Sequence, residues 1–175
     1  MIWQSTYQSP VGRLFLASDG VHLTGLWMEG QKYFGSTANE QMVLREDLPL
    51  FYLTKAWLDR YFAGRRPEIS DIPLAPAGSE FRQAVWKLLC QIPYGEVITY
   101  GVLARKLDQT GMSAQAVGGA VGHNPISIII PCHRVVGADG SLTGYAGGLE
   151  RKKQLLELEG VDIISQKERV IVLKR

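Results

Sequence analysis

The sequence predicts a mixed α/β (α+β) protein with a small N-terminal antiparallel sheet and helix, followed by a mostly helical C-terminal part. Residues 2–28 alternate short apolar runs with turn residues, residues 72–78 contain two prolines and a glycine, and the chain then changes to helical spacing. We therefore expect an N-terminal α/β domain over 1–76, a C-terminal domain over 77–165 and a tail of unknown role over 166–175.

Three short strands are expected first, over residues 2–8, 13–17 and 21–28, and they should form an antiparallel meander. Residues 31–46 are polar and mixed, which indicates a loop or an irregular helix. Residues 48–62 place Phe51, Leu58 and Phe62 at helical spacing, and Gly64 is a suitable stop. The N-terminal part is therefore expected to be a helix on a small sheet.

Beyond the linker, three residues are suitable helix N-caps. Ser79 precedes a helix expected over 80–91, Thr99 one over 100–107, and Ser113 one over 114–123. Residues 108–112 should turn between the last two, which indicates a helix-turn-helix.

The helix after Ser113 has an unusual composition, because Gly118, Gly119 and Gly122 each cost on the order of 1 kcal/mol in a helix interior. Such small residues allow close approach, either by a neighbouring element of the protein or by the walls of a narrow nucleic-acid groove. Both explanations can hold, on opposite faces of the helix.

Composition and charge describe a soluble globular chain of 175 residues with a formal net charge of +2. Residues 1–76 hold seven Lys/Arg against eight Asp/Glu, which leaves 12 against nine for residues 77–175. This charge permits DNA binding without arguing for it.

We find neither a targeting signal nor a metal-binding motif in the sequence. The N-terminus lacks the basic region and apolar stretch of a signal peptide, and the run over 126–130 is too short to span a membrane, so we expect a cytoplasmic protein without membrane contact. Two cysteines and three histidines with no Cys-x-x-Cys predict neither a disulfide framework nor a metal site.

Cys132 is the outstanding candidate for a reactive group. Three isoleucines precede Pro131, and we expect them to form a buried strand that Pro131 ends, so that Cys132 leaves the core at a turn beside basic residues. Such surroundings favour the thiolate, and a cysteine near a histidine is a candidate nucleophile. Cys90 lies in a helical apolar pattern and is expected to be a packing residue.

Several ordered motifs make the chain resemble the O6-alkylguanine-DNA alkyltransferases, also called methylated-DNA-protein-cysteine methyltransferases. The motifs are Tyr94-Gly95-Glu96-Val97-Ile98-Thr99-Tyr100, Ala116-Val117-Gly118-Gly119-Ala120, Asn124-Pro125, Ile130-Pro131-Cys132-His133-Arg134-Val135-Val136-Gly137 and Gly144-Tyr145-Ala146-Gly147-Gly148-Leu149. The resemblance runs from about residue 79 to Gly160, and the N-terminal half shares only its strand-rich start and following helix.

This resemblance implies a single-turnover repair reaction without a cofactor, in which an alkyl group on guanine O6 moves irreversibly to Cys132. A thiolate suits displacement at an sp³ carbon. By resemblance, Cys132 is linked through water to His133, and His133 to Glu159 near the end of the last helix. Without the family, Glu159 reads as part of a solvated helix face.

The resemblance assigns further residues to the pocket. Tyr100 is expected to donate to guanine N3, and Asn124 to shape the active-site turn by hydrogen bonding. Backbone groups of Cys132 and Val135 are expected to read the base edge, and the loop containing Tyr145, Ala146 and Gly147 to wall the pocket.

The lesion must be flipped out of double-stranded DNA, which costs a few kcal/mol. The expected DNA contacts, made by a monomer in the minor groove, are Gln115, Ala116, Gly118, Gly119, Val121 and Arg134. Many relatives carry an arginine where this chain has Gln115, and glutamine lacks the charge and stacking plane of guanidinium. We therefore expect weaker DNA affinity or slower flipping than in an arginine-bearing relative.

Two other classes of function stay open on the sequence. One is an inert reader that binds alkylated DNA, although such proteins lack the acceptor cysteine that this chain retains. The other is a Cys-His hydrolase that turns over repeatedly on a small ester or amide.

Overall fold

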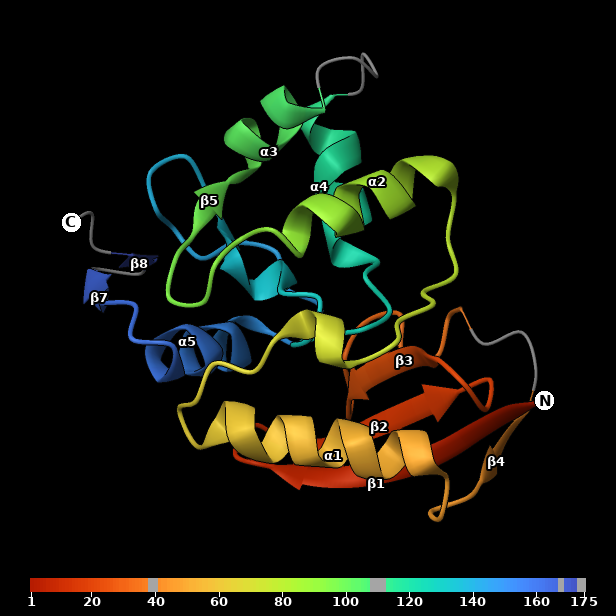
Figure 1. The fold of residues 1–175 in the computed structure, drawn as a ribbon. Coiled ribbons are helices and arrows are strands. Elements are labelled where there is room, and N and C mark those ends of the chain that lie inside the picture. Colours follow the sequence, from red (N-terminus) through yellow and green to blue (C-terminus); the bar gives the residue numbers. More distant parts are fainter. Residues whose placement is uncertain (38–40, 108–112, 167–168, 173–175) are drawn as a thin grey trace.

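The computed structural model describes residues 1–37, 41–107, 113–166 and 169–172. Figure 1 shows the arrangement: the N-terminal sheet and the helix that follows it lie at one end of the molecule, the helices of residues 80–122 gather at the other, and the helix of residues 149–158 lies at one side between them. The predicted mixture of a small N-terminal sheet with a helical C-terminal part is confirmed.

The N-terminal sheet has the strand order β3-β2-β1-β4. Its strands are β1 (Ile2–Ser9), β2 (Gly12–Ser18), β3 (Leu23–Met28) and β4 (Met42–Leu44). The first three form the predicted antiparallel meander. The antiparallel sheet is extended by a parallel strand that was not predicted: β4 pairs with β1 and lies inside the segment expected to be a loop or irregular helix. It satisfies backbone groups along the edge of β1 that β2 does not reach.

Helix α1 (Pro49–Phe62) packs against the sheet. Pro49 occupies the first helical position, where its missing N–H costs nothing. The helix buries Phe51, Trp57, Leu58 and Tyr61. Gly64 adopts a φ of 80°, as expected for a residue just beyond a helix end. Tyr61 lies in the interior, and its hydroxyl reaches Glu159 in the C-terminal half.

The C-terminal helices are α2 (Glu80–Leu89), α3 (Tyr100–Lys106), α4 (Ala114–Gly122) and α5 (Leu149–Leu158). The three predicted N-caps are confirmed, because the side-chain oxygens of Ser79, Thr99 and Ser113 accept from backbone N–H groups at 3.1–3.2 Å. Helix α2 ends two residues earlier than predicted. Helices α3 and α4 pack together, and the expected turn over 108–112 lies outside the described residues.

The remaining elements are short. Strands β5 (Ile98–Thr99) and β6 (Val135–Val136) pair in parallel, and β7 (Ile163–Gln166) and β8 (Arg169–Val172) form an antiparallel hairpin. Short 3-10 helices cover Ile69–Asp71 and Cys132–Arg134. The hairpin is fastened to a neighbouring loop, because Leu142 N–H donates to the Val170 carbonyl at 2.9 Å and Val172 N–H to the Gly140 carbonyl at 2.8 Å.

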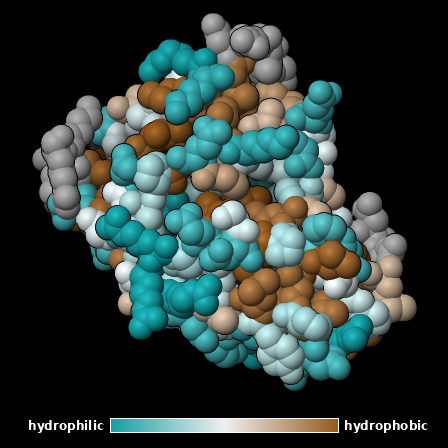
Figure 2. Space-filling view, viewed as in Figure 1, coloured by the Kyte–Doolittle hydropathy of each residue, from teal (hydrophilic) through white to brown (hydrophobic). Residues whose placement is uncertain are grey.

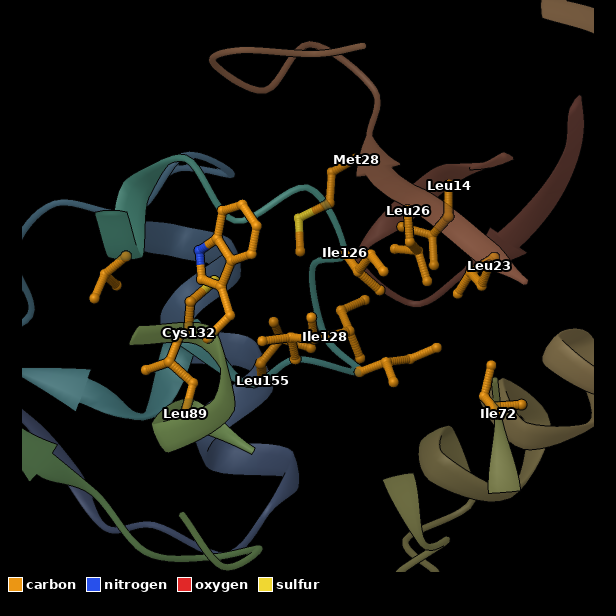
Figure 3. Packing of buried hydrophobic residues seen from close by; sticks show 14 of the residues in the cluster. Leu14, Leu23, Leu26, Met28, Ile72, Leu89, Ile126, Ile128, Cys132 and Leu155 are labelled. Atoms are coloured by element: carbon orange, nitrogen blue, oxygen red, sulfur yellow. The ribbon is translucent and has the colours of Figure 1, made fainter. Parts of the chain in front are cut away.

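One cluster of buried apolar side chains draws on both halves of the chain. Figure 3 shows Met28 and Leu26 from β3 near Ile126, with Cys132, Leu89 and Leu155 in the same packed interior. The backbones also meet, since Leu26 N–H donates to the Pro125 carbonyl at 2.8 Å. The segment that leads to Cys132 is thus held directly against the N-terminal sheet.

The outer surface is mixed. Figure 2 shows hydrophilic side chains over much of the face seen in Figure 1, interrupted by patches of apolar ones. Within the described ranges, no helix is both long enough and apolar enough to cross a bilayer.

Candidate active site

The segment before Cys132 is a buried turn, and the prediction of a three-isoleucine strand is wrong. Ile128 has a φ of 72°, a left-handed conformation that is rare for a β-branched residue, and Ile130 N–H donates back to the Ile126 carbonyl at 3.1 Å. Asn124 holds this turn: its side-chain nitrogen donates to the Ile130 carbonyl at 2.8 Å, and its oxygen accepts from Ile126 N–H at 3.0 Å. These hydrogen bonds from the Asn124 amide offset the cost of the strained backbone in the turn directly before Pro131.

Cys132 begins the 3-10 helix and is only 5 % exposed. It does not leave the core as expected, because the turn keeps it inside the apolar cluster shown in Figure 3. Burial raises the pKa of its thiol, while a hydrogen bond with Asn124 and the positive charge of Lys152 act in the opposite direction. The net direction is upward, so the surroundings favour the thiol in the free protein, contrary to the prediction of a thiolate.

Glu159 lies at the C-terminal end of α5 and collects donors from separate parts of the chain. Its Oε2 lies 2.6 Å from His133 Nε2, accepts from the Tyr61 hydroxyl at 2.6 Å and accepts from Arg134 Nη2 at 3.1 Å. Its Oε1 accepts from Arg134 Nε at 2.8 Å and from Gly95 N–H at 3.3 Å. Burial alone raises the pKa of this carboxyl, but His133 and Arg134 outweigh it and hold the pKa well below its ordinary value.

His133 is fully buried and oriented by this carboxylate. Because an ionised carboxylate only accepts hydrogen bonds, the neutral ring carries its proton on Nε2 and leaves Nδ1 as an acceptor. Nδ1 has no hydrogen-bond partner in the described part of the chain. Burial lowers the pKa of the imidazole, against the opposing effect of Glu159. His133 is thus a neutral base with one free nitrogen.

Two residues expected to contact DNA point inward instead. Arg134 is 6 % exposed, and besides Glu159 it binds the Ile92 carbonyl through Nη1 at 2.6 Å. Val121 is 2 % exposed, on the face of α4 that packs into the core. Neither side chain therefore lies on the exposed surface expected to contact DNA: burial of Arg134 is compensated by its pairing with Glu159, and the apolar side chain of Val121 is stabilised by the core.

Tyr100 lies at the start of α3, opposite the loop that the resemblance assigns to the pocket. Its hydroxyl donates to the carbonyls of Thr143 at 3.2 Å and Gly144 at 3.3 Å. Burial, followed by the negative charge of the Cys132 thiolate form, raises its pKa to about 12. Tyr100 therefore stays protonated at neutral pH and can donate a hydrogen bond to a bound group.

Lys152 is a residue of this site that the sequence reading missed. It is completely buried, and its Nζ donates to the carbonyls of Val135 at 2.6 Å and Thr143 at 3.0 Å. Burial lowers its pKa to about 8. A signal was present, because Lys152 lies three and four residues before the buried Leu155 and Leu156, on the inner stripe of α5.

The predicted pocket residues gather around these groups. Val135 is completely buried, Tyr145 is 9 % exposed, and the Tyr145 hydroxyl has no hydrogen-bond partner among the described residues. Ala146 and Gly147 are half-buried, and the Ala146 carbonyl accepts from Lys32 N–H at 3.0 Å. The loop is thus tied to the N-terminal half as well as to Lys152.

A cavity of about 190 Å³ opens between this loop and α4. Its lining is rich in small residues and consists of Lys32, Tyr33, Gly118, Gly119, Gly122, His123, Gly144, Tyr145 and Ala146. A Cβ atom added at any of the three α4 glycines would meet no heavy atom within 4 Å. Close packing inside the protein therefore does not explain these glycines, and Gln115 and Gly119 lie on the exposed side of the same helix.

Comparison with known proteins gives one family for both halves of the chain. Residues 80–161 match the family model of the 6-O-methylguanine DNA methyltransferase DNA binding domain, and residues 2–76 match that of the 6-O-methylguanine DNA methyltransferase ribonuclease-like domain. The chain is 45 % identical over 165 residues to the methylated-DNA–protein-cysteine methyltransferase of Haemophilus influenzae, covering 94 % of this chain and 90 % of that protein.

Solved structures resemble the fold equally well. A crystal structure of the Mycobacterium tuberculosis O6-methylguanine methyltransferase has a TM-score of 0.78 at 47 % identity, covering 91 % of this chain and 93 % of that one. A structure of Mycobacterium tuberculosis OGT in complex with DNA has a TM-score of 0.77 at 47 % identity, covering 90 % and 92 %.

Proposed function

The chain belongs to the methylated-DNA–protein-cysteine methyltransferase family, and from this premise we infer that it repairs DNA directly, by transferring a methyl or other alkyl group from guanine O6 to one of its own cysteines. We propose that the acceptor is Cys132. The observation that carries this assignment is the placement of one thiol among Asn124, Lys152 and Tyr100, next to a His133 that Glu159 orients.

We propose that the reaction starts with removal of the thiol proton. His133 Nδ1 takes this proton through a bridging water, and Glu159 stabilises the imidazolium that forms. The positive charge of Lys152 favours the thiolate at the same moment. The Cys132 thiol is thus protonated in the free protein and becomes a nucleophilic thiolate only when His133 takes its proton in the active site.

Transfer then forms one bond and breaks one. Cys132 Sγ bonds to the alkyl carbon, the bond from that carbon to guanine O6 breaks, and the electron pair stays on the guanine. Tyr100 donates a proton toward N3 of the leaving base and recovers one from solvent or from His133, which stabilises the developing charge. The products are guanine and an S-alkylcysteine, and no step regenerates the thiol.

The DNA-facing surface is proposed to be the small-residue face of α4. Helices α3 and α4 would act as a helix-turn-helix that places Gln115, Ala116, Gly118 and Gly119 in the minor groove of double-stranded DNA. The cavity of about 190 Å³ beside this face supplies an opening through which a flipped base can approach the pocket. We further propose that the protein acts as a cytoplasmic monomer, with the functional division of the chain near Pro76.

The experiment is a repair assay with excess double-stranded DNA that contains O6-methylguanine. Restored guanine should reach a plateau of one per protein molecule, Cys132→Ser should restore none, and Cys90→Ser should match the wild type. Binding without restored guanine would show an inert reader instead. Repeated turnover of small esters without DNA would show a hydrolase.

A further inference from the structure

Tyr61 connects the N-terminal half of the chain to the carboxylate that orients His133. It lies on α1, is 1 % exposed, and its hydroxyl donates to Glu159 Oε2 at 2.6 Å across 98 positions of sequence. Its ring is fixed by stacking on Trp57, with centroids 5.7 Å apart, and by an edge contact with Tyr94 at 6.1 Å. The hydroxyl is therefore held in one place by packing.

This hydroxyl is a permanent donor. Burial and the negative charge of Glu159 raise the pKa of Tyr61 well above its ordinary value, so the phenol keeps its proton throughout the range in which His133 titrates. Tyr61 and His133 donate to the same oxygen of Glu159. Each donor on that oxygen disperses negative charge that would otherwise favour the protonated, cationic form of His133.

The other charged and titratable groups that act on His133 come from α5 and from its own 3-10 helix. Glu159 favours the imidazolium, while Arg134 and Lys152 oppose it, and the Cys132 thiol is adjacent in sequence. Arg134 already donates hydrogen bonds to Glu159 through two of its nitrogens. Tyr61 is the donor in this group that comes from the N-terminal half.

We propose that Tyr61 is a positioning residue for alkyl transfer, through which the N-terminal half keeps His133 neutral and correctly oriented to receive the Cys132 proton. The proposal rests on the function inferred above. It assigns the N-terminal half a part in the chemistry, in addition to its part in the core.

Tyr61→Phe tests this, because phenylalanine keeps the ring contacts and removes only the donor. Tyr7→Phe is the matched control: the Tyr7 hydroxyl also donates to a carboxylate at 2.6 Å, that of Asp59 on α1, but neither Tyr7 nor Asp59 is among the groups that shift the pKa of His133. The readout is the pH profile of single-turnover transfer, together with the NMR titration of the His133 ring in the DNA-free protein.

In Tyr61→Phe, the acid limb of the rate profile and the His133 titration should both move to higher pH, by on the order of one unit. Tyr7→Phe should leave both unchanged. A Tyr61→Phe protein that is folded and titrates like the wild type would overturn the proposal, because a purely structural tyrosine would not move either midpoint. Absence of transfer in the wild type would instead refute the proposed function, which the DNA-free titration does not require.

Discussion

Single residues of the site differ in how well the sequence predicts them. Cys132, His133 and Glu159 follow from motif resemblance, and in the structure His133 Nε2 is hydrogen-bonded to the Glu159 carboxylate. Arg134 and Val121 were expected on the DNA-facing surface but are buried, because sequence position does not reveal which way a side chain points. Tyr61 was missed because its partner lies 98 residues away, a distance at which no local pattern operates.

Lys152 provides the most direct test of how the thiol is activated. Its charge lowers the pKa of Cys132, so Lys152→Met should shift the midpoint of thiol alkylation by iodoacetamide to higher pH. The rate is measured on the Cys132 peptide across a pH series in a Cys90→Ser background. Lys153→Met is the control, since Lys153 pairs outward with Glu157 at 3.9 Å. An unchanged midpoint in Lys152→Met would refute this role.

Substitution of Gln115 tests how the protein flips the base out of the duplex. It is exposed at the start of α4, and arginine there would add a charge and a planar group able to stack in place of the flipped base. Gln115→Arg should bind lesion DNA more tightly and transfer faster in single-turnover assays. Gln154→Arg, on the exposed side of α5, adds the same charge elsewhere. If Gln115→Arg shows no gain over that control, or is slower than the wild type, glutamine is not the limiting residue.

Secondary-structure elements were predictable where local chemistry decides them. Ser79, Thr99 and Ser113 begin their helices as expected, since a cap needs only its own side chain and a nearby N–H. Ile128 shows the opposite case. A run of β-branched residues favours a strand, but hydrogen bonds from Asn124 and packing in the core enforce a left-handed turn.

The glycines of helix α4 face open space, so a methyl group can be added there without a clash inside the protein. Gly119→Ala should stabilise the protein by about 1 kcal/mol through helix propensity while weakening binding to lesion DNA. Urea unfolding and a binding titration measure the two effects. Ala56→Gly on the exposed side of α1 should lower stability by a similar amount and leave DNA binding unchanged. Unaltered DNA binding in Gly119→Ala would contradict the proposed contact face.

At the scale of the whole molecule, the two halves share one core and one carboxylate. Glu159 receives donors from α1, from Gly95 and from the 3-10 helix that contains Cys132. Composition and spacing predicted the two halves, but they carry no information on how the halves face each other. That arrangement depends on long-range pairs such as Leu26 with Ile126, which only the folded chain brings together.

Glu159→Gln should lower the free energy of unfolding at neutral pH by about 3 kcal/mol, because it leaves the buried Arg134 without its counter-charge. The pKa of Glu159 is held below its ordinary value of 4.5, so its contribution is present above that pH and is lost as the pH falls. Urea unfolding should therefore show a smaller loss on acidification in Glu159→Gln than in the wild type. Glu157→Gln, an exposed change on the same helix, should match the wild type, and equal acid sensitivity of all three proteins would contradict this account.

The claim that Cys132 is a one-use alkyl acceptor is tested most directly by peptide mass spectrometry after incubation with DNA that contains O6-methylguanine. We expect one added methylene on the peptide that contains Cys132, an unmodified Cys90 peptide, and no further reaction when fresh DNA is added. A modified Cys90, or an unmodified Cys132 in a sample that has lost its O6-methylguanine, would contradict it.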